Sequence, residues 1–346
     1  MKNHQLKVLI SILILSGLTA CGILSRKDKL PQYIDKDGLV AGVSKAVCYS
    51  GFRSGQHPDR GEGAVNPTYD EILEDLMILS EDNLFELIRL YDCGDNSEMV
   101  LRVIEENDID IKVLLGIWLD AELSAHETCA WLNEPIPQEK LEQNRQKNLK
   151  EIGRGITLAN QYPQTVVAVN VGNEALVDWN DHKVSPDTVI AYVKMVKERI
   201  NQPVTVADNY KWWAEHGLEL SEVVDFVSIH LYPVWEGKDI DEGLSFSIEN
   251  VNEVRQALPE SNIVITEAGW ATIASEFGER ASQDKQLQYY NELMTWAKDN
   301  KITTFFFEAF DEDWKGNPNN PLGAEKHWGL YTVDRQPKKV IQALKQ

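Results

Sequence analysis

The stretch Val166-Val-Ala-Val-Asn-Val-Gly-Asn-Glu-Ala-Leu176 begins as an apolar, mostly β-branched run and ends in a turn glycine, an amide and a carboxyl group. Such a run is typical of a parallel strand that is buried on both faces. A carboxylate at the mouth of an apolar strand is costly unless the protein uses it. The segment Asn262-Ile-Val-Ile-Thr-Glu-Ala-Gly-Trp270 has the same form and carries Glu267. Together they predict a barrel in which two strand ends each deliver one glutamate, as in a retaining glycoside hydrolase.

Apolar segments alternate with longer amphipathic segments along the chain. The expected strands are residues 43–50, 84–91, 111–119, 166–174, 204–208, 226–232, 262–267 and 303–310. The expected helices are residues 69–80, 97–107, 138–162, a helix starting at Ser185-Pro186, and 284–299. This rhythm predicts an α/β fold, a (β/α)8 TIM barrel. A doubly wound open sheet is the alternative, but the glycine pattern of a nucleotide-binding turn is missing.

The composition restricts the kinds of partner. The chain has 346 residues, 43% of them hydrophobic, which suits one large domain, although two smaller domains would also fit. The formal net charge is −21 at pH 7. Because a chain this acidic repels phosphate backbones, nucleic acid is not expected as a partner, whereas a neutral polysaccharide is not disfavoured.

The first residues have the form of an export signal. A short basic region and the apolar stretch Val8–Leu15, too short for a membrane span, precede Leu18-Thr-Ala-Cys21. This tetrapeptide resembles the lipobox of bacterial lipoproteins, in which the cysteine is lipidated; an ordinary secretory signal is the alternative. We expect a signal peptide over residues 1–20, a tether over 21–38 and a barrel domain over 39–346. Gly22 after the cysteine implies a lipid anchor in the outer membrane of a Gram-negative cell envelope.

Three further cysteines follow, and export implies an oxidising compartment. Cys48 falls inside an expected strand and is predicted to be a buried thiol. Cys93 and Cys129 lie in loops after the second and third strands, so we expect that they can form a disulfide. None of the cysteine spacings resembles a zinc site.

Polar and aromatic residues lie at the strand ends, where barrel enzymes carry their chemistry. Sugar hydroxyls need acids and amides, and the C–H face of a pyranose stacks on aromatic rings. The candidate sugar-binding residues are Arg53, Gln56, Arg89, Tyr91, Asn173, Asp208, Asn209, Tyr232, Trp270, Glu308, Glu312, Trp314 and Lys315. Some of these residues have structural alternatives. Trp270 and Trp314 could be core residues, and Arg53 and Gln56 could anchor a loop. Arg89, Tyr91 and Tyr232 could be structural supports. His230 is predicted to be a hydrogen-bonded strand-end residue, and no metal or other cofactor is expected.

Four of these segments carry a family resemblance. They are residues 47–58 (VCYSGFRSGQHP), 171–175 (VGNEA), 265–270 (ITEAGW) and 307–315 (FEAFDEDWK). In this order they resemble glycoside hydrolase family 17, over about residues 40–340. The resemblance implies a (β/α)8 catalytic domain that acts on β-1,3-glucans. Ala268 and Ala271 depart from the pattern of the plant members, which leaves fine specificity near that loop open.

By the resemblance, Glu174 matches the general acid/base and Glu267 the nucleophile. In a retaining mechanism the two carboxyl groups stand about 5–5.5 Å apart, and the nucleophile is ionised while the acid carries a proton. Asn173 is placed to bond the 2-hydroxyl of the sugar. The alternative interpretation makes both glutamates ion-pair partners at the barrel rim.

The sequence therefore predicts a lipid-anchored, monomeric enzyme that hydrolyses β-1,3-glucan polysaccharides or oligosaccharides such as laminarin. A β-1,3-glucanosyltransferase and a non-catalytic glycan-binding lipoprotein are the two alternatives. A mannanase or cellulase specificity also remains open, because the shape of the site rather than the glutamates selects the linkage.

Overall fold

The computed structural model describes residues 38, 40, 42, 45–59 and 61–346. The expected signal peptide, Cys21 and the expected tether up to residue 37 lie outside the described residues. Within the described ranges, no helix combines the length and the apolar character that crossing a bilayer would require.

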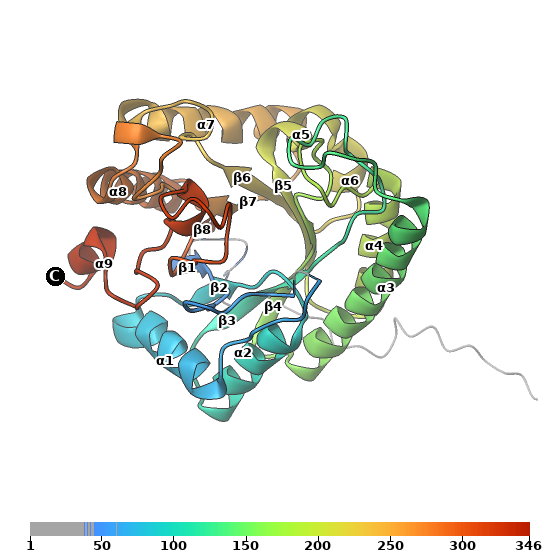
Figure 1. Ribbon diagram of the computed structural model, residues 1–346, viewed down its shortest axis with the longest axis horizontal. Coiled ribbons are helices and arrows are strands. Elements are labelled where there is room, and N and C mark those ends of the chain that lie inside the picture. The colour runs from blue at the N-terminus through green and yellow to red at the C-terminus, as the bar shows by residue number, and fades with distance from the viewer. Residues whose placement is uncertain (1–37, 39, 41, 43–44, 60) are drawn as a thin grey trace, which may run out of the picture. The chain divides into compact units, whose positions relative to one another are not determined.

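The described part of the chain contains a closed barrel of eight parallel strands in chain order (Figure 1). They are β1 Lys45–Cys48, β2 Leu87–Arg89, β3 Lys112–Ile117, β4 Val166–Asn173, β5 Val204–Asn209, β6 Val227–Leu231, β7 Ile263–Ala268 and β8 Thr304–Phe306. The last strand closes on the first, with Phe305 opposite Ala46. The predicted TIM barrel is confirmed, and the open-sheet alternative is wrong.

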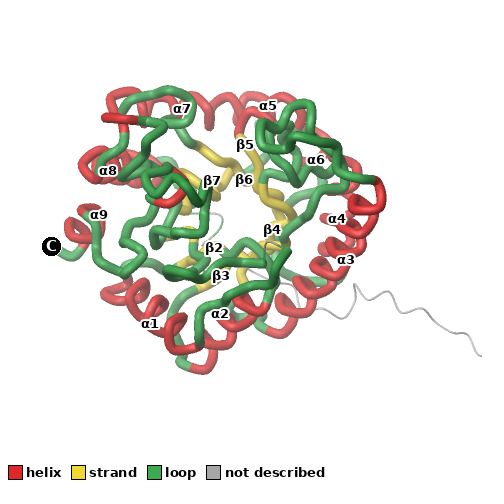
Figure 2. Tube along the Cα trace, in the orientation of Figure 1, coloured by secondary structure: helices red, strands yellow, loops and turns green. Residues whose placement is uncertain are grey.

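Helices surround the barrel on its outside (Figure 2). The α-helices are α1 Tyr69–Ser80, α2 Asp95–Glu106, α3 Gln138–Gln161, α4 Pro186–Lys197, α5 Tyr210–His216, α6 Leu218–Ser221, α7 Ile240–Ala257, α8 Gln283–Asp299 and α9 Lys339–Leu344. Short 3-10 turns lie at Glu81–Asn83, Gly278–Arg280 and Ala324–Lys326. The predicted start of α4 is confirmed, since the Ser185 hydroxyl accepts from the Thr188 amide.

The second and eighth strands are shorter than predicted. Residues 84–91 and 303–310 were expected to be strands, but only Leu87–Arg89 and Thr304–Phe306 pair in the ladder. Beyond them the apolar composition continues, and single backbone bonds to the neighbouring strands persist, from the Leu90 amide to the Leu114 carbonyl oxygen and from the Phe307 amide to the Ala268 carbonyl oxygen. These irregular ends carry Tyr91 and Glu308 at the edge of the barrel where the strands end.

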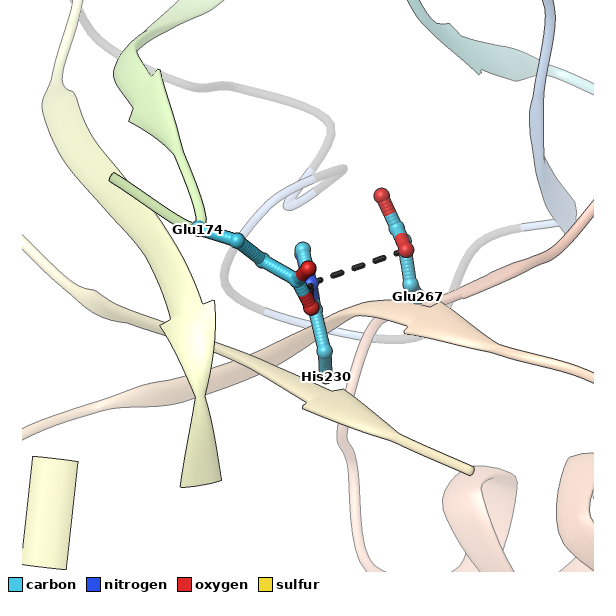
Figure 3. A group of neighbouring side chains, drawn as sticks. All are labelled: Glu174, His230 and Glu267. Atoms are coloured by element: carbon cyan, nitrogen blue, oxygen red, sulfur yellow. Dashed lines mark hydrogen bonds and ion pairs between the residues drawn. The ribbon is translucent and has the colours of Figure 1, made fainter. Parts of the chain in front are cut away.

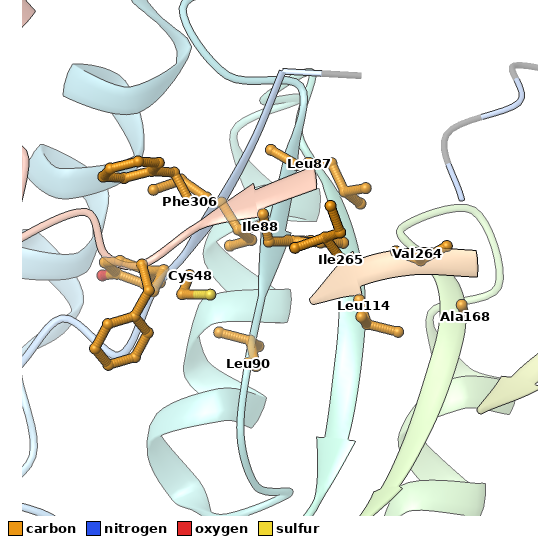
Figure 4. Close-up of a cluster of buried hydrophobic side chains, with 14 of the residues drawn as sticks. Cys48, Leu87, Ile88, Leu90, Leu114, Ala168, Val264, Ile265 and Phe306 are labelled. Atoms are coloured by element: carbon orange, nitrogen blue, oxygen red, sulfur yellow. The ribbon is translucent and has the colours of Figure 1, made fainter. Parts of the chain in front are cut away.

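A packed apolar core fills the barrel and the layer between its strands and helices, where the Phe306 ring lies 5.0 Å from that of Tyr290 of α8. Figure 4 shows Cys48, Ile88, Leu114, Ile265 and Phe306 among side chains contributed by strands on opposite sides of the barrel. All five are fully buried. Because each buried Leu, Ile or Phe side chain contributes about 1.5–3 kcal/mol, this core supplies the rigid frame on which the strand ends are mounted.

All three cysteines in the described residues are free and buried, so the expected Cys93–Cys129 disulfide is wrong. The Cys93 thiol lies 3.0 Å from the Gly116 carbonyl oxygen, and a β-carbon on Gly155 would come within 3.1 Å of its sulfur. Cys93 therefore fills a gap between the barrel and α3, a position that the spacing of cysteines could not reveal. The predicted buried thiol at Cys48 is confirmed.

A buried ion pair joins α1 to the segment after β8. Asp75 is fully buried, and Arg335 donates to both of its carboxylate oxygens, at 2.8 and 2.6 Å. The Arg335 guanidinium also donates to the Gly51 carbonyl oxygen at 2.9 Å. Arg53 approaches the same carboxylate at 2.9 Å. One aspartate thus holds the loop after β1, the first helix and the C-terminal segment together.

Replacing Asp75 with Asn is expected to lower the free energy of unfolding by about 3–5 kcal/mol, because Arg335 would be left buried without its counter-charge. Urea unfolding followed by tryptophan fluorescence measures the loss. The matched control is Glu81→Gln, which removes an exposed pair with Lys345 at 2.5 Å. Such surface pairs contribute about 0–1 kcal/mol. Equal losses in the two variants would contradict the assignment.

Candidate active site

The end of β4 turns sharply and presents Glu174. Gly172 has φ +85° and Glu174 has φ +47°, both in the left-handed region. A left-handed conformation suits glycine, but for a glutamate it costs of order 1–3 kcal/mol. Such strain persists only where surrounding contacts impose it. This corner directs the Glu174 side chain toward the ends of β6 and β7 (Figure 3).

Glu174, His230 and Glu267 converge from β4, β6 and β7 (Figure 3). His230 Nδ1 lies 2.9 Å from Glu174 Oε1 and 3.5 Å from Glu267 Oε2. Each residue has a polar atom within 4.8 Å of those of the other two. Two carboxyl groups at this separation fit the short spacing of retaining glycosidases, about 5–5.5 Å.

Glu267 is buried and surrounded by hydrogen-bond donors. Arg89 Nη1 donates to its Oε1 at 2.6 Å, the Tyr91 hydroxyl to the same oxygen at 3.0 Å, and the Tyr232 hydroxyl to Oε2 at 2.5 Å. Burial alone would raise the pKa of Glu267, but His230, Arg89 and the two hydroxyls outweigh burial and lower it. Its side chain is 7% exposed while that of Glu174 is 23% exposed. The two carboxyl groups therefore have different environments.

Arg89 also orients Asn173. Its Nη2 donates to Asn173 Oδ1 at 2.5 Å, so the amide oxygen is engaged and the amide NH2 is directed elsewhere. Arg89 is fully buried, so it contacts side chains and not substrate. Among the predicted sugar contacts, Arg89, Tyr91 and Tyr232 are therefore supports of Glu267, and half-buried Asn173 keeps its donors available.

The same three-residue group has the residue types of a metal site. However, Arg89 already neutralises Glu267, and a divalent cation bound to this carboxylate would face the guanidinium at close range. A carboxyl pair flanked by a fixed cation is better suited to proton transfer and nucleophilic attack than to holding a second cation.

The acidic residues after β8 form a closed ion-pair cluster. Lys315 Nζ lies 2.8 Å from Glu312 and also contacts Glu308, while the Ser50 hydroxyl donates to Glu312 at 2.7 Å. Both glutamates are buried, at 2% and 1% exposure, and Lys315 keeps 12% of its side chain exposed. Burial raises the pKa of Glu308, against the opposing charge of Lys315. Both glutamates therefore pair with Lys315, while Glu308 Oε1 has no hydrogen-bond partner among the described residues.

Two further residues predicted to contact sugar, Trp270 and Asp208, are fully buried. Trp270 is fully buried between the barrel and its helices, with its ring 5.3 Å from that of Tyr289 and its Nε1 donating to the Arg280 carbonyl oxygen at 2.8 Å. Asp208 is also fully buried and accepts from the backbone amide of Leu176 at 2.9 Å. The core alternative holds for the tryptophan.

Other predicted contacts take structural partners. Asn209 caps α5 by accepting from the Lys211 amide at 2.9 Å. Arg53 pairs with α1 carboxylates, and Gln56 Nε2 donates to Glu71 at 3.0 Å, so the loop-anchor alternative describes both. Trp314 is half-buried with its ring 5.9 Å from that of Phe52.

Sequence reasoning missed two exposed tryptophans in the loops at the strand ends. Trp179 and Trp235 are each 45% exposed, in the loops after β4 and β6. The Trp235 ring lies 4.5 Å from Phe277 and 6.4 Å from Trp328, and the Trp328 ring lies 5.2 Å from that of Tyr232. Their only signal in the sequence is a tryptophan in a loop after a strand. His230 was recognised as a hydrogen-bonded residue but not as the group between the two glutamates.

Comparison with known proteins places the barrel in a wider context. A family model described as "BtgE/BtgC glycoside hydrolase domain" matches residues 46–329. A curated relative from Aspergillus niger, called a putative glucan endo-1,3-beta-glucosidase, is 27% identical over 79% of this chain and 40% of its own length. The chain thus spans about two fifths of that relative. A glucan 1,3-beta-glucosidase from Arthroderma benhamiae is 24% identical over 72% of this chain and 78% of its own.

Two solved structures share the fold. The crystal structure of an endo-laminarinase from Formosa superposes with a TM-score of 0.76 at 24% identity, covering 90% of this chain and 89% of that one. A glycoside hydrolase family 17 beta-1,3-glucanosyltransferase from Rhizomucor miehei superposes with a TM-score of 0.65 at 23% identity, covering 86% and 96%.

Proposed function

The chain belongs to the BtgE/BtgC glycoside hydrolase domain family, and on that premise we propose that it is a retaining hydrolase of β-1,3-glucosidic bonds in glucans such as laminarin. The observation that carries the proposal is the carboxyl pair from β4 and β7, separated by no more than a sugar ring and held in unlike surroundings. The two curated relatives, from Aspergillus niger and Arthroderma benhamiae, are both named as 1,3-beta-glucosidases of glucan, which supports the linkage.

In the proposed reaction Glu267 attacks the anomeric carbon while Glu174 protonates the departing glycosidic oxygen. Arg89, Tyr91 and Tyr232 keep the nucleophile ionised and fixed. Glycosylation of Glu267 removes its charge, and Glu174, now a carboxylate, takes a proton from the water that releases the sugar. The Asn173 amide is placed to donate to the sugar 2-hydroxyl, a contact that strengthens in the transition state.

One experiment tests the proposal. The protein without residues 1–21 is incubated with laminari-oligosaccharides, linear and branched β-1,3-glucans, a cellulose-type β-1,4-glucan and a mannan, and products are separated over time. NMR of the first products gives the anomeric configuration. Release of β-configured sugars from the β-1,3-glucans alone is expected. Initial α-products, or no release from any glucan, would reject the proposal.

The same time course separates hydrolysis from transfer. The family 17 glucanosyltransferase from Rhizomucor miehei has the same barrel, so a transferase is the second candidate. Products longer than the substrate at high oligosaccharide concentration would identify transfer to sugar, and exclusively shorter products would identify transfer to water.

We further propose that Cys21 carries a lipid that anchors a monomeric enzyme to the outer membrane. Incorporation of labelled palmitate into the full-length protein, and its absence in Cys21→Ser, would support the anchor. Label in both proteins would reject it. Light scattering of the soluble form tests the monomer.

A further inference from the structure

In the strained corner that presents Glu174, most backbone N–H and C=O groups make hydrogen bonds. The Glu174 amide donates to the Ala207 carbonyl oxygen at 2.9 Å, and the Leu176 amide to the Asp208 carboxylate at 2.9 Å. The Ala175 carbonyl oxygen accepts from the Val184 amide at 2.7 Å. These bonds come from β5 on one side and from the end of the loop before α4 on the other. A left-handed glutamate needs such an imposed set of contacts.

Two further carbonyl groups of the corner accept hydrogen bonds from side chains of one short segment. Asn180 Nδ2 donates to the Glu174 carbonyl oxygen at 3.0 Å, and His182 Nε2 to the Asn173 carbonyl oxygen at 2.8 Å. Because a carbonyl oxygen only accepts, Nε2 of His182 carries a hydrogen. The His182 ring lies against Trp118, with 4.6 Å between ring centroids, which fixes the loop to the end of β3.

Unlike the other residues that bond to this corner's backbone, Asn180 also contacts the Glu174 carboxyl group. The same Nδ2 lies 3.3 Å from Glu174 Oε2, while His230 Nδ1 lies 2.9 Å from Oε1. Asn180 is 9% exposed, so its amide is held at a fixed place behind the carboxyl group. The Asn180 side chain thus hydrogen-bonds to both the backbone carbonyl group and the carboxyl group of Glu174.

We propose that Asn180 is a positioning residue for the acid/base: it holds Glu174 in the left-handed corner and favours its carboxylate over its protonated form. This inference rests on the proposed function of Glu174. It assigns Asn180 no contact with substrate. A donor to a carboxylate oxygen stabilises the ionised form, so the amide helps Glu174 to give up its proton to the leaving group.

The other titratable groups that face Glu174 are His230 from β6, Glu267 from β7, Asp208 from β5 and Glu325 from the segment after β8. Three of these are carboxyl groups. Asn180 and His230 are the side chains that donate to its carboxylate in the described hydrogen bonds. Removing the Asn180 donor therefore leaves His230 as the described side chain hydrogen-bonded to this carboxyl group.

The test compares Asn180→Ala and Asn180→Asp with the wild type and with Asn160→Ala as matched control. Asn160 Nδ2 also donates to two backbone carbonyl oxygens, of Ile156 at 2.7 Å and Arg199 at 3.0 Å, but at the opposite end of the barrel. Rates on laminari-oligosaccharides are measured from acid to alkaline pH. A second readout follows the carboxyl carbon of Glu174 by NMR titration of 13C-glutamate protein, assigned with Glu174→Gln.

Asn180→Ala is expected to move the alkaline limb of the kcat/KM profile to higher pH and to lower kcat about tenfold to a hundredfold, with KM changed less than about threefold. Asn180→Asp keeps the size of the side chain and adds a facing charge, so it moves the limb further in the same direction. If the Asn180→Ala protein does not fold, the Asn180→Asp protein is used to measure the shift of the alkaline limb. The control is expected to match the wild type.

An unshifted alkaline limb and an unshifted NMR titration in both Asn180 variants would overturn the inference. A loss of rate that follows only a loss of thermal stability, with the profile unmoved, would also overturn it and leave a purely structural role. If the wild type releases no sugar, the proposed function fails, and the NMR titration alone still decides whether Asn180 controls the proton on Glu174.

Discussion

Glu267→Gln is expected to lower the release of sugar from laminarin by about 10³-fold or more, because no covalent intermediate can form. Glu174→Gln is expected to cost about 10²–10⁴-fold on the same substrate, the usual contribution of a general acid/base. Reducing-sugar assays at saturating laminarin measure both, and circular dichroism checks that both proteins fold.

The two glutamine variants differ in a way that assigns their roles. With an aryl glucoside whose leaving group needs no proton, Glu174→Gln should still form the glycosyl-enzyme and show a burst of released phenol, while Glu267→Gln should show none. Glu292→Gln is the matched control, since this half-buried glutamate of α8 accepts from Gln288 within the same helix. Wild-type activity in either active-site variant would refute the assignment.

Arg89→Met is expected to move the acid limb of the pH–rate profile upward and to lower kcat by about 10²-fold. The pKa of Glu267 is lowered in the folded protein, and Arg89 is one of the groups that lower it. Without the guanidinium, the burial that raises this pKa is opposed by His230 and the two tyrosine hydroxyls only. Glu267, the proposed nucleophile, is then expected to become protonated, and inactive, at a higher pH than in the wild type.

The same change affects stability with a defined sign. A carboxyl group with a lowered pKa stabilises the fold above its unfolded pKa of about 4.3, and this contribution is lost as pH falls through the folded value. In Arg89→Met that contribution shrinks, and a buried charge loses its partner at a cost of about 3–5 kcal/mol near neutral pH. Tyr91→Phe is the matched control, because it removes a single donor to the same oxygen, at 3.0 Å. Equal acid limbs in wild type and Arg89→Met would contradict this account.

The barrel and the positions of both glutamates were predictable because each follows from a local pattern. An apolar strand that ends in a carboxyl group is visible within about ten residues of sequence, and parallel strands bring their ends to one edge. Glu174 and Glu267 met for that reason. The closed topology followed from the number of alternations and not from any single segment.

The direction in which the other side chains point could not be predicted from their position along the sequence alone. Trp270 follows Glu267 by three residues, yet it turns outward beneath α7, where a β-carbon on Gly243 would come 3.0 Å from its ring. Asp208 sits at a strand end but turns inward against the Leu176 amide. A strand end fixes where a residue lies along the barrel, whereas neighbouring loops determine which way it points. Asn180 and His182 were missed because their contacts arise only when the loop folds back.

The ion pair between Asp75 and Arg335 affects how a shortened version of the protein should be designed. The family match stops at residue 329, so a gene trimmed to the match would omit Arg335 and also Lys338, which lies 2.7 Å from the Asp311 carboxylate. The carboxylates of Asp75 and Asp311, which Arg335 and Lys338 neutralise, would then be buried without a counter-charge. The ion pairs that hold the barrel together therefore extend past residue 329, and recombinant versions should retain Arg335 and Lys338.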